Sequence, residues 1–192
     1  MQVLKTREVI VSLMVGQVQL IVGPMFAGKT TELLRRLRRC RLGRQSCVLL
    51  KPSVDTRYES GAVVTHDQLR DPQCQVVRTL ADAVIPKDTQ VVGIDEGQFF
   101  PDLVTYCATW ANDHGIVVIV AALDGTFNQE PFMQVAQLAS HAELVDKIHA
   151  VCFVCGANAA FTIRKDDTCK DLVAIGGSES YEARCRLHLT QQ

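Results

Sequence analysis

The 192-residue sequence lacks the features that would direct it to a membrane or to nucleic acid. It has no run of 18 apolar residues, so no transmembrane helix is expected. Its formal net charge is only −1, so no overall attraction to nucleic acid or to an anionic membrane is indicated. No internal repeat or low-complexity segment is evident. We therefore expect a globular protein with no nucleic acid and no membrane among its partners.

The sequence also lacks a clear signal peptide. Residues 1–15 are mildly apolar, but Lys5, Arg7 and Glu8 interrupt them and no small-residue cleavage site follows. We interpret this segment as a flexible N-terminal tail and expect a cytoplasmic protein. Under that expectation the eight cysteines favour reduced thiols or metal binding over a disulfide framework.

Residues 16–31 contain the motif that organises the chain. An apolar strand leads directly into a phosphate loop of the form G-x-x-x-x-G-K-[ST], with Gly23, Gly28, Lys29 and Thr30 at the fixed positions. In such loops the glycines turn the backbone N–H groups toward phosphate oxygens, the lysine reaches the β- and γ-phosphates, and the hydroxyl binds Mg²⁺. A nucleotide site at the start of the following helix is predicted.

An alternation of strands and helices follows, which predicts a parallel α/β domain with its ligand at the carboxyl ends of the strands. The expected strands are 46–51, 63–66, 75–78, 89–95 and 115–123, and the expected helices are 31–42, 101–114 and 132–138, with a helical turn at 79–84. The helix 31–42 carries five arginines. A nucleic-acid patch is one interpretation of this run, and a solvated helix face is the interpretation we favour.

Residues 91–95 form an apolar strand that ends in a carboxylate, as in a Walker B motif. Asp95 would hold Mg²⁺ together with Thr30. Glu96 follows directly, where a carboxylate can accept the proton of the attacking oxygen. That oxygen belongs to a second substrate in a kinase or to water in an ATPase, and Glu96 could also be an inert neighbour of the metal ligand.

Two metal-binding pairs occur near the end of the chain. Cys152-x-x-Cys155 and Cys185-x-x-His188 suit a closed, tetrahedral structural zinc site, with one Zn²⁺ per chain. The alternative is a set of unpaired thiols in a hairpin. A second unit is placed at 147–192, with short strands at 159–165 and 171–175, and we expect Cys169 in its long loop to be free.

Five motifs carry a family resemblance. They are Gly-Pro-Met-Phe-Ala-Gly-Lys-Thr (23–30), Asp-Thr-Arg-Tyr (55–58), Asp-Glu-Gly-Gln-Phe-Phe (95–100), Ala-Ala-Leu-Asp-Gly-Thr-Phe (121–127) and the Cys/His pairs. In this order they resemble the cytosolic, zinc-containing (type II) thymidine kinases over about residues 16–190. The resemblance implies a RecA-like phosphate-loop domain over 16–146 and a zinc-ribbon domain with a lasso loop over 147–192.

The resemblance also implies an activity and its partners. The enzyme would transfer the γ-phosphate of ATP, bound with Mg²⁺, to the 5′-hydroxyl of thymidine or deoxyuridine, in pyrimidine salvage for DNA synthesis. A homotetramer and feedback inhibition by thymidine triphosphate are implied as well.

The family's functional residues are carried over by position. Glu96 resembles the general base. The ATP site would contain Gly23, Pro24, Met25, Phe26, Ala27, Gly28, Lys29, Thr30, Asp55, Thr56, Arg57, Asp95 and Gln98. The nucleoside site would contain Met25, Phe99, Leu123, Phe127, Thr162, Leu172, Val173, Ala174, Ile175, Gly176 and Tyr181. Ala174 stands where a larger aliphatic residue is common, and His188 where cysteine often binds the metal.

Two other functions fit parts of the pattern. A phosphate-loop ATPase acting on a nucleic-acid or protein partner would use the same Asp95-Glu96 pair. A GTPase switch is disfavoured because no Asn-Lys-x-Asp guanine-reading motif occurs in the sequence. Formation of thymidine monophosphate from ATP and thymidine would separate a kinase from both.

Overall fold

Parallel pairings join six strands into the central sheet. The computed structural model describes residues 16–53, 63–64, 70–71, 74–165 and 179–189, and within them the sheet order is β5-β2-β6-β7-β1-β8. The elements are β1 (Gln17–Gly23), α1 (Lys29–Leu42), β2 (Cys47–Pro52), β3 (Val63–Val64), β4 (Arg70–Asp71), β5 (Cys74–Val77), η1 (Leu80–Asp82), β6 (Val91–Ile94), η2 (Gly97–Phe99), α2 (Leu103–Asn112), β7 (Val117–Leu123), α3 (Met133–Leu138), β8 (Leu144–Lys147), β9 (Ala150–Val151), β10 (Asn158–Ala159), β11 (Phe161–Arg164), β12 (Tyr181–Arg184) and η3 (Arg186–His188). The predicted parallel α/β class is confirmed.

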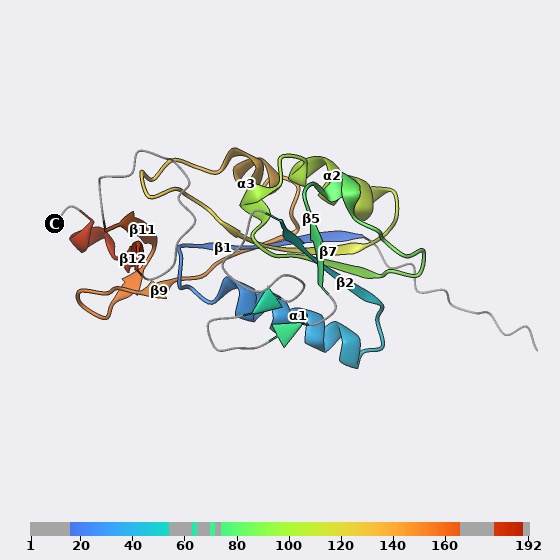
Figure 1. Ribbon diagram of the computed structural model, residues 1–192, viewed down its shortest axis with the longest axis horizontal. Helices are drawn as coiled ribbons and strands as arrows, with labels where there is room; N and C mark the ends of the chain where they lie inside the picture. Colours follow the sequence, from blue (N-terminus) through green and yellow to red (C-terminus); the bar gives the residue numbers. More distant parts are fainter. Residues whose placement is uncertain (1–15, 54–62, 65–69, 72–73, 166–178, 190–192) are drawn as a thin grey trace, which may run out of the picture.

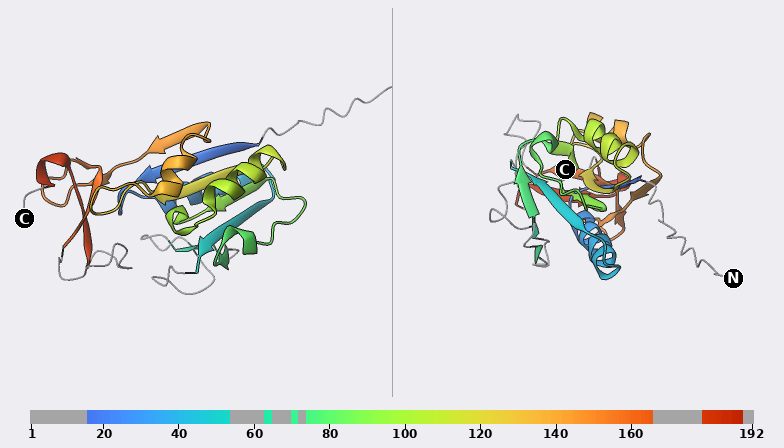
Figure 2. Two further views of the ribbon diagram at one scale, coloured as in Figure 1. Left: turned by 90° about the horizontal axis from the view of Figure 1, so that it is seen from above. Right: turned by 90° about the vertical axis from the view of Figure 1, so that its right-hand side faces the viewer.

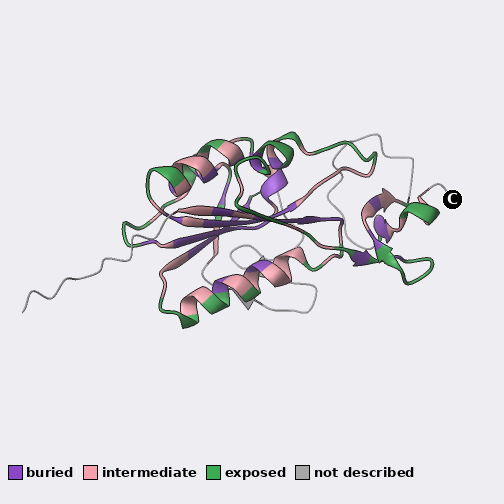
Figure 3. Ribbon diagram, turned by 180° about the vertical axis from the view of Figure 1, so that it is seen from behind, coloured by how far each residue is buried: buried purple, intermediate pink, exposed green. Residues whose placement is uncertain are grey.

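The central sheet separates two helical layers (Figure 1). Helix α1 covers one face, and α2 with α3 covers the other. Successive side chains of a strand point to opposite faces, so β1 contributes Leu20 to the core under α2 and α3 and Ile21 to the core under α1. Gly93 lets α1 approach closely, because a Cβ atom there would lie 2.7 Å from a methyl carbon of Leu37. Figure 3 shows the buried strands between these layers.

Helix α1 begins two residues before the predicted start. Gly28 caps it in the left-handed conformation, with φ 82°, so the helix takes in Lys29 and Thr30 of the phosphate loop. Leu33 and Leu37, four positions apart and so on one side of the helix, are fully buried on its inner face. No helix in the described residues is long and apolar enough to cross a membrane.

Four strands were not predicted, namely the short strands β4 and β9 and the longer β8 and β12. β8 pairs with β1 at the edge of the sheet and keeps Leu144 and Val145 exposed, and β12 pairs antiparallel with β11. The predicted strand 171–175, the tail 1–15 and Cys169 lie outside the described residues. β8 carries the main sheet as far as Lys147, and the division of the chain at residue 146 stays a prediction.

A small ribbon of short antiparallel pairs lies beyond the end of β1 (Figures 1 and 2). It consists of β9 with β10 and of β11 with β12. Its buried cluster is made of Ala150, Cys152, Ala159 and Ala183. The ribbon therefore stands at the edge of the sheet where the phosphate loop leaves β1.

Candidate functional site

The phosphate loop turns sharply between β1 and α1. Gly23 has φ 153° and packs so tightly that a Cβ atom would lie 2.3 Å from the carbonyl oxygen of Ile148. Phe26 and Gly28 both have left-handed backbones, with φ 65° and 82°. The loop opens onto the first turn of the 14-residue helix α1, where the backbone N–H groups and the helix dipole favour an anion.

The structure brings the two predicted magnesium residues together from positions 65 apart. The hydroxyl of Thr30 donates a hydrogen bond to Asp95, with Oγ1 3.0 Å from Oδ1. Asp95 directly follows β6 and is only 6% exposed. Lys29 Nζ donates to the carbonyl oxygen of Pro24 at 2.7 Å, which folds the lysine over its own loop. A hydroxyl, a carboxylate and an ammonium group thus meet at the predicted triphosphate site.

Glu96 is held in a fixed position directly after Asp95. Its backbone is left-handed, with φ 51° and ψ 43°. This conformation costs a non-glycine residue about 1–3 kcal/mol and is found most often at functional sites. Gln98 Nε2 donates to Glu96 Oε2 at 2.6 Å, and Gln98 Oε1 accepts the N–H of Leu123 at 3.0 Å. The carboxylate of Glu96 is therefore tied through one amide side chain to the end of β7.

The described residues of the predicted nucleoside site lie at the same edge of the sheet or in the ribbon. Met25 is half-buried in the phosphate loop, Phe99 closes η2, and Leu123 ends β7. Phe127 follows β7, whereas Thr162 and Tyr181 are buried in the ribbon. The structure joins several of them directly: the N–H of Met25 donates to Thr162 Oγ1 at 2.9 Å, and Gln98 links Leu123 to Glu96.

Arg164 is a residue of this region that the sequence analysis missed. Its guanidinium carbon lies 4.1 Å from the centre of the Phe127 ring, and its Nη2 donates to the hydroxyl of Tyr181 at 3.1 Å. It thus connects two aromatic residues of the predicted nucleoside site. The alternation of side chains along β11 could have indicated Arg164, because Arg164 lies on the same face of that strand as the predicted site residue Thr162.

The remaining predicted site residues lie outside the described residues. These are Asp55, Thr56 and Arg57 of the second motif and Leu172, Val173, Ala174, Ile175 and Gly176 of the lasso. Their placement stays a prediction.

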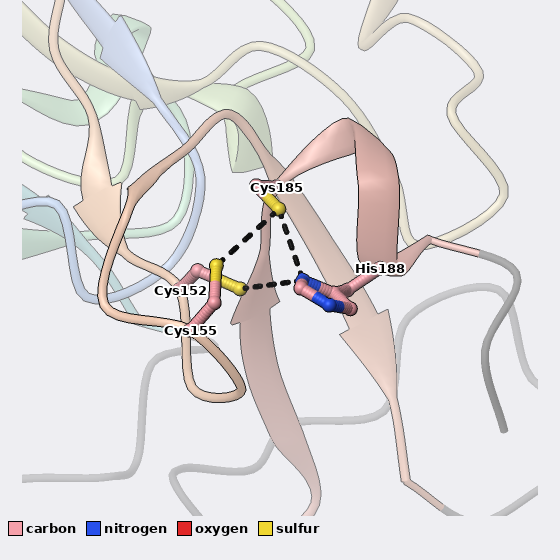
Figure 4. Close-up of side chains that lie close together, drawn as sticks. All are labelled: Cys152, Cys155, Cys185 and His188. Atoms are coloured by element: carbon pink, nitrogen blue, oxygen red, sulfur yellow. Dashed lines mark hydrogen bonds between the residues drawn. The ribbon is translucent and has the colours of Figure 1, made fainter.

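The predicted metal residues form one compact cluster (Figure 4). The ligand atoms of Cys152, Cys155, Cys185 and His188 all lie within 4.8 Å of one another. The Cys155 and Cys185 sulfurs are 3.8 Å apart, and His188 Nδ1 lies 3.8 Å from Cys152 Sγ and 3.2 Å from Cys185 Sγ. Tetrahedral zinc with Zn–S bonds of about 2.3 Å requires sulfur separations of about 3.8 Å. The four side chains therefore fit a tetrahedral metal ion.

Backbone turns present these ligands. The N–H of Gly156 donates to the carbonyl of Cys152 at 2.9 Å, and Gly156 takes the left-handed conformation at φ 73°. In the second pair the N–H of His188 donates to the carbonyl of Cys185 at 3.0 Å, which closes η3. Each C-x-x-C/H spacing is thus folded as a tight knuckle.

The thiols of the cluster have shifted acidities. Burial raises the pKa of Cys152, but hydrogen bonds from the backbones of Cys185, Cys155 and Val154 outweigh it and lower that pKa to about 6. For Cys155 the backbone of Ala157 lowers the pKa, yet burial and the thiols of Cys152 and Cys185 raise it by more. A thiolate at Cys152 is the form that binds a metal, so the cluster is prepared for one.

Comparison with known proteins adds the family. A model of the thymidine kinase family matches residues 16–189. The cytosolic thymidine kinase of Homo sapiens is 46% identical over 175 residues, which cover 90% of this chain and 72% of that protein. The thymidine kinases of raccoon poxvirus and of rabbit fibroma virus (strain Kasza) are each 44% identical over 89% of this chain, and cover 95% and 94% of the viral proteins. The matched range includes both the phosphate loop and the Cys/His cluster.

Proposed function

Because the chain belongs to the thymidine kinase family, we propose that it transfers the γ-phosphate of ATP to the 5′-hydroxyl of thymidine and of deoxyuridine. The observation that carries this proposal is the convergence of the phosphate loop, the Thr30–Asp95 pair and the Gln98-held Glu96 at one edge of the sheet. In this role the enzyme serves pyrimidine salvage for DNA synthesis.

The phosphate loop and α1 bind the triphosphate. Backbone N–H groups of residues 26–30 and the positive end of α1 face the phosphate oxygens, and Lys29 exchanges the carbonyl of Pro24 for the β- and γ-phosphates. Thr30 and Asp95, which already contact each other, would hold the Mg²⁺ that accompanies ATP. When bound, this ion neutralises charge on the phosphate oxygens. Asp55, Thr56 and Arg57 are proposed to complete the phosphate side.

Glu96 acts as the general base. Its carboxylate accepts the proton of the 5′-hydroxyl as that oxygen attacks the γ-phosphorus, and ADP leaves with the bridging oxygen. Gln98 contributes by donating a hydrogen bond to Glu96 Oε2, which fixes the orientation of the carboxylate. The other carboxylate oxygen, Oε1, then receives the proton of the hydroxyl. A base fixed in advance loses little entropy in reaching the hydroxyl.

The pyrimidine lies among apolar and aromatic side chains. Met25, Phe99, Leu123, Phe127 and Tyr181 are its proposed walls, and the hydroxyl of Thr162 with the backbone of residues 172–176 reads the edge of the base. Backbone donors and acceptors give strong selectivity, because the wrong base leaves them unpaired. The ring contacts of Arg164 with Phe127 and Tyr181 support this arrangement of the walls.

The Cys/His cluster holds one structural Zn²⁺. Three thiolates and an imidazole fill a tetrahedral shell and leave no position for a substrate, so the ion would stabilise the ribbon and take no part in phosphate transfer. A cytoplasmic location, a homotetramer and inhibition by thymidine triphosphate belong to the same proposal. They rest on the resemblance to the type II family.

A nucleoside panel tests the activity. The protein is incubated with ATP and Mg²⁺, alone and with thymidine, deoxyuridine, deoxycytidine or deoxyguanosine, and ADP and nucleoside monophosphate are both measured. We expect monophosphate from thymidine and deoxyuridine, formed in step with ADP. ADP released at the same rate without any nucleoside would instead identify an ATPase.

A further inference from the structure

Thr162 makes a contact with the phosphate loop that a nucleoside-binding role does not explain. It lies in β11 of the ribbon and is only 6% exposed. Its hydroxyl oxygen accepts the backbone N–H of Met25 at 2.9 Å, across 137 positions of the sequence. A backbone donor of the phosphate loop is therefore satisfied by the ribbon.

Other residues of the phosphate loop also contact the ribbon or the chain segment that leads into it. Ala27 packs against the buried ribbon cluster of Ala150, Cys152, Ala159 and Ala183. Gly23 lies against the carbonyl of Ile148, just before the ribbon begins. The loop is thus supported at its start, at Met25 and at Ala27 by chain that leads into the ribbon or belongs to it.

We propose that Thr162 is a positioning residue for the phosphate loop, and that the ribbon acts through it on the ATP site. The proposal rests on the proposed function, in which this loop binds ATP. A phosphate loop works only if its N–H groups converge on the triphosphate. By holding the N–H of Met25 outward, Thr162 fixes the first turn of the loop, and the following N–H groups of residues 26–30 are directed at the phosphates.

This role is compatible with a contact between Thr162 and the base. A hydroxyl has one donor and two acceptor positions, and the bond from Met25 uses an acceptor position only. The proton of the hydroxyl remains available to a base acceptor. The two roles differ in which substrate they affect, so they can be separated by measuring binding of ATP without nucleoside.

The test compares Thr162→Val with Thr162→Ser. Valine keeps the shape but removes the acceptor, whereas serine keeps the hydroxyl. Affinity for adenylyl imidodiphosphate with Mg²⁺ is measured by calorimetry without thymidine, and KM values for both substrates follow. We expect Thr162→Val to weaken analogue binding roughly tenfold, the usual effect of leaving one buried donor unpaired, and Thr162→Ser to stay within about twofold of the original protein.

Three readouts decide the outcome. Unchanged metal content and a single cooperative melting transition, lowered by no more than a few degrees, show that the weaker binding of the valine variant is not a general loss of structure. If Thr162→Val binds the analogue as tightly as the original protein, and only the KM for thymidine rises, the proposal is wrong and the proposed function stands. If the original protein itself neither binds the analogue nor phosphorylates thymidine, the proposed function fails first.

Hydrogen exchange keeps the test decisive if the valine variant does not fold. In the original protein without nucleotide, the amide of Met25 should exchange slowly because it is donated to Thr162. Exchange at the rate of an unprotected amide would overturn the proposal without any substitution.

Discussion

The central sheet and the ribbon are held together by different means. The largest fully buried side chains belong to the sheet and its covering elements, and they include Phe100, Leu20, Ile21, Leu33 and Leu103. The buried cluster of the ribbon contains only three alanines and Cys152. Burying a large aliphatic side chain contributes about 1.5–3 kcal/mol, and an alanine far less. A structural zinc ion contributes on the order of 10 kcal/mol.

Because of this difference, the two regions position their residues of the proposed site in different ways. The sheet can hold Asp95 and Glu96 rigidly because their strand is buried between two apolar layers. The ribbon supplies Thr162, Arg164 and Tyr181 to the same edge, and its buried cluster contains only small side chains and Cys152. The proposed site therefore combines a part that burial stabilises with a part that the proposed zinc ion would stabilise.

The largest expected effect lies on the sheet side. Replacing the proposed base in Glu96→Gln should lower kcat by roughly 10²–10⁴, the usual contribution of a general base, while analogue binding persists. The exposed carboxylate of Asp88, replaced in Asp88→Asn, is the matched control and should leave kcat unchanged. Near-normal turnover of Glu96→Gln with thymidine would remove Glu96 from this role.

The second effect concerns the metal of the ribbon. We expect about one zinc per chain in freshly purified, reduced protein, and little in Cys152→Ser, because a tetrahedral site loses one of its four ligands. Cys40→Ser is the control, since Cys40 lies in α1 and packs against the core between that helix and the sheet, away from the ribbon. Elemental analysis measures both. Equal zinc in the two variants, or none in the original protein, would contradict the assignment.

A smaller effect is expected at the contact between the two regions. Arg164→Met removes the guanidinium from the Phe127 ring and from the Tyr181 hydroxyl, and should raise the KM for thymidine several-fold, with a smaller change in the KM for ATP. Arg164→Lys keeps the charge but not the planar group, so it should restore only part of the affinity. Equal changes in both KM values would assign Arg164 a merely structural role.

The smallest effect belongs to α1. The hydrogen bond from Arg35, aided by Arg36 and opposed by burial, lowers the pKa of Glu32 to about 2 from its ordinary 4.5. Its stabilising contribution is present above pH 4.5 and is lost as the pH falls toward 2. Arg35 is more than half exposed, so solvent screens the pair and we expect its contribution to the free energy of unfolding to be small.

Denaturant unfolding of Glu32→Gln measures this contribution. The difference in unfolding free energy from the original protein should be largest near neutral pH and should vanish near pH 2. High salt should reduce it as well. A difference that grows on acidification would have the wrong sign for this ion pair.

The sequence predicted the parts of the fold that have strong local patterns. The phosphate loop, the helix that follows it and the apolar strands β6 and β7 follow from motif and residue pattern. The helices begin or end one or two residues from the predicted bounds, because capping and not periodicity sets their ends. At α1 the left-handed Gly28 moved the start back to Lys29.

The missed elements lack such patterns. β8 is an edge strand with exposed apolar side chains, so no buried run announces it. β12 buries a carboxylate, because Arg184 pairs with Glu182 within the strand. The burial of Glu182 depends on its ion pair with Arg184, and the strand has no regular alternation of apolar residues that would predict it. The ion pair is seen only in the folded structure.

The candidate site divides in the same way. Motifs identified Thr30, Asp95, Glu96 and the four metal ligands, because their chemistry requires fixed residue types at fixed spacing. No motif identified Arg164, whose partners Phe127 and Tyr181 lie in other segments. The hydrogen bond from the N–H of Met25 to Thr162 could not be predicted from the sequence either, since it joins a backbone group to a distant hydroxyl.

Hydrogen exchange along the chain, before and after zinc chelation, tests the central comparison most directly. We predict that peptides from β9 to β12 lose protection on chelation, that β6 and β7 keep theirs, and that residues 23–30 exchange somewhat faster because the ribbon supports them. Simultaneous loss of protection in the sheet and the ribbon, or no change in either, would contradict the account that metal holds one region and burial the other.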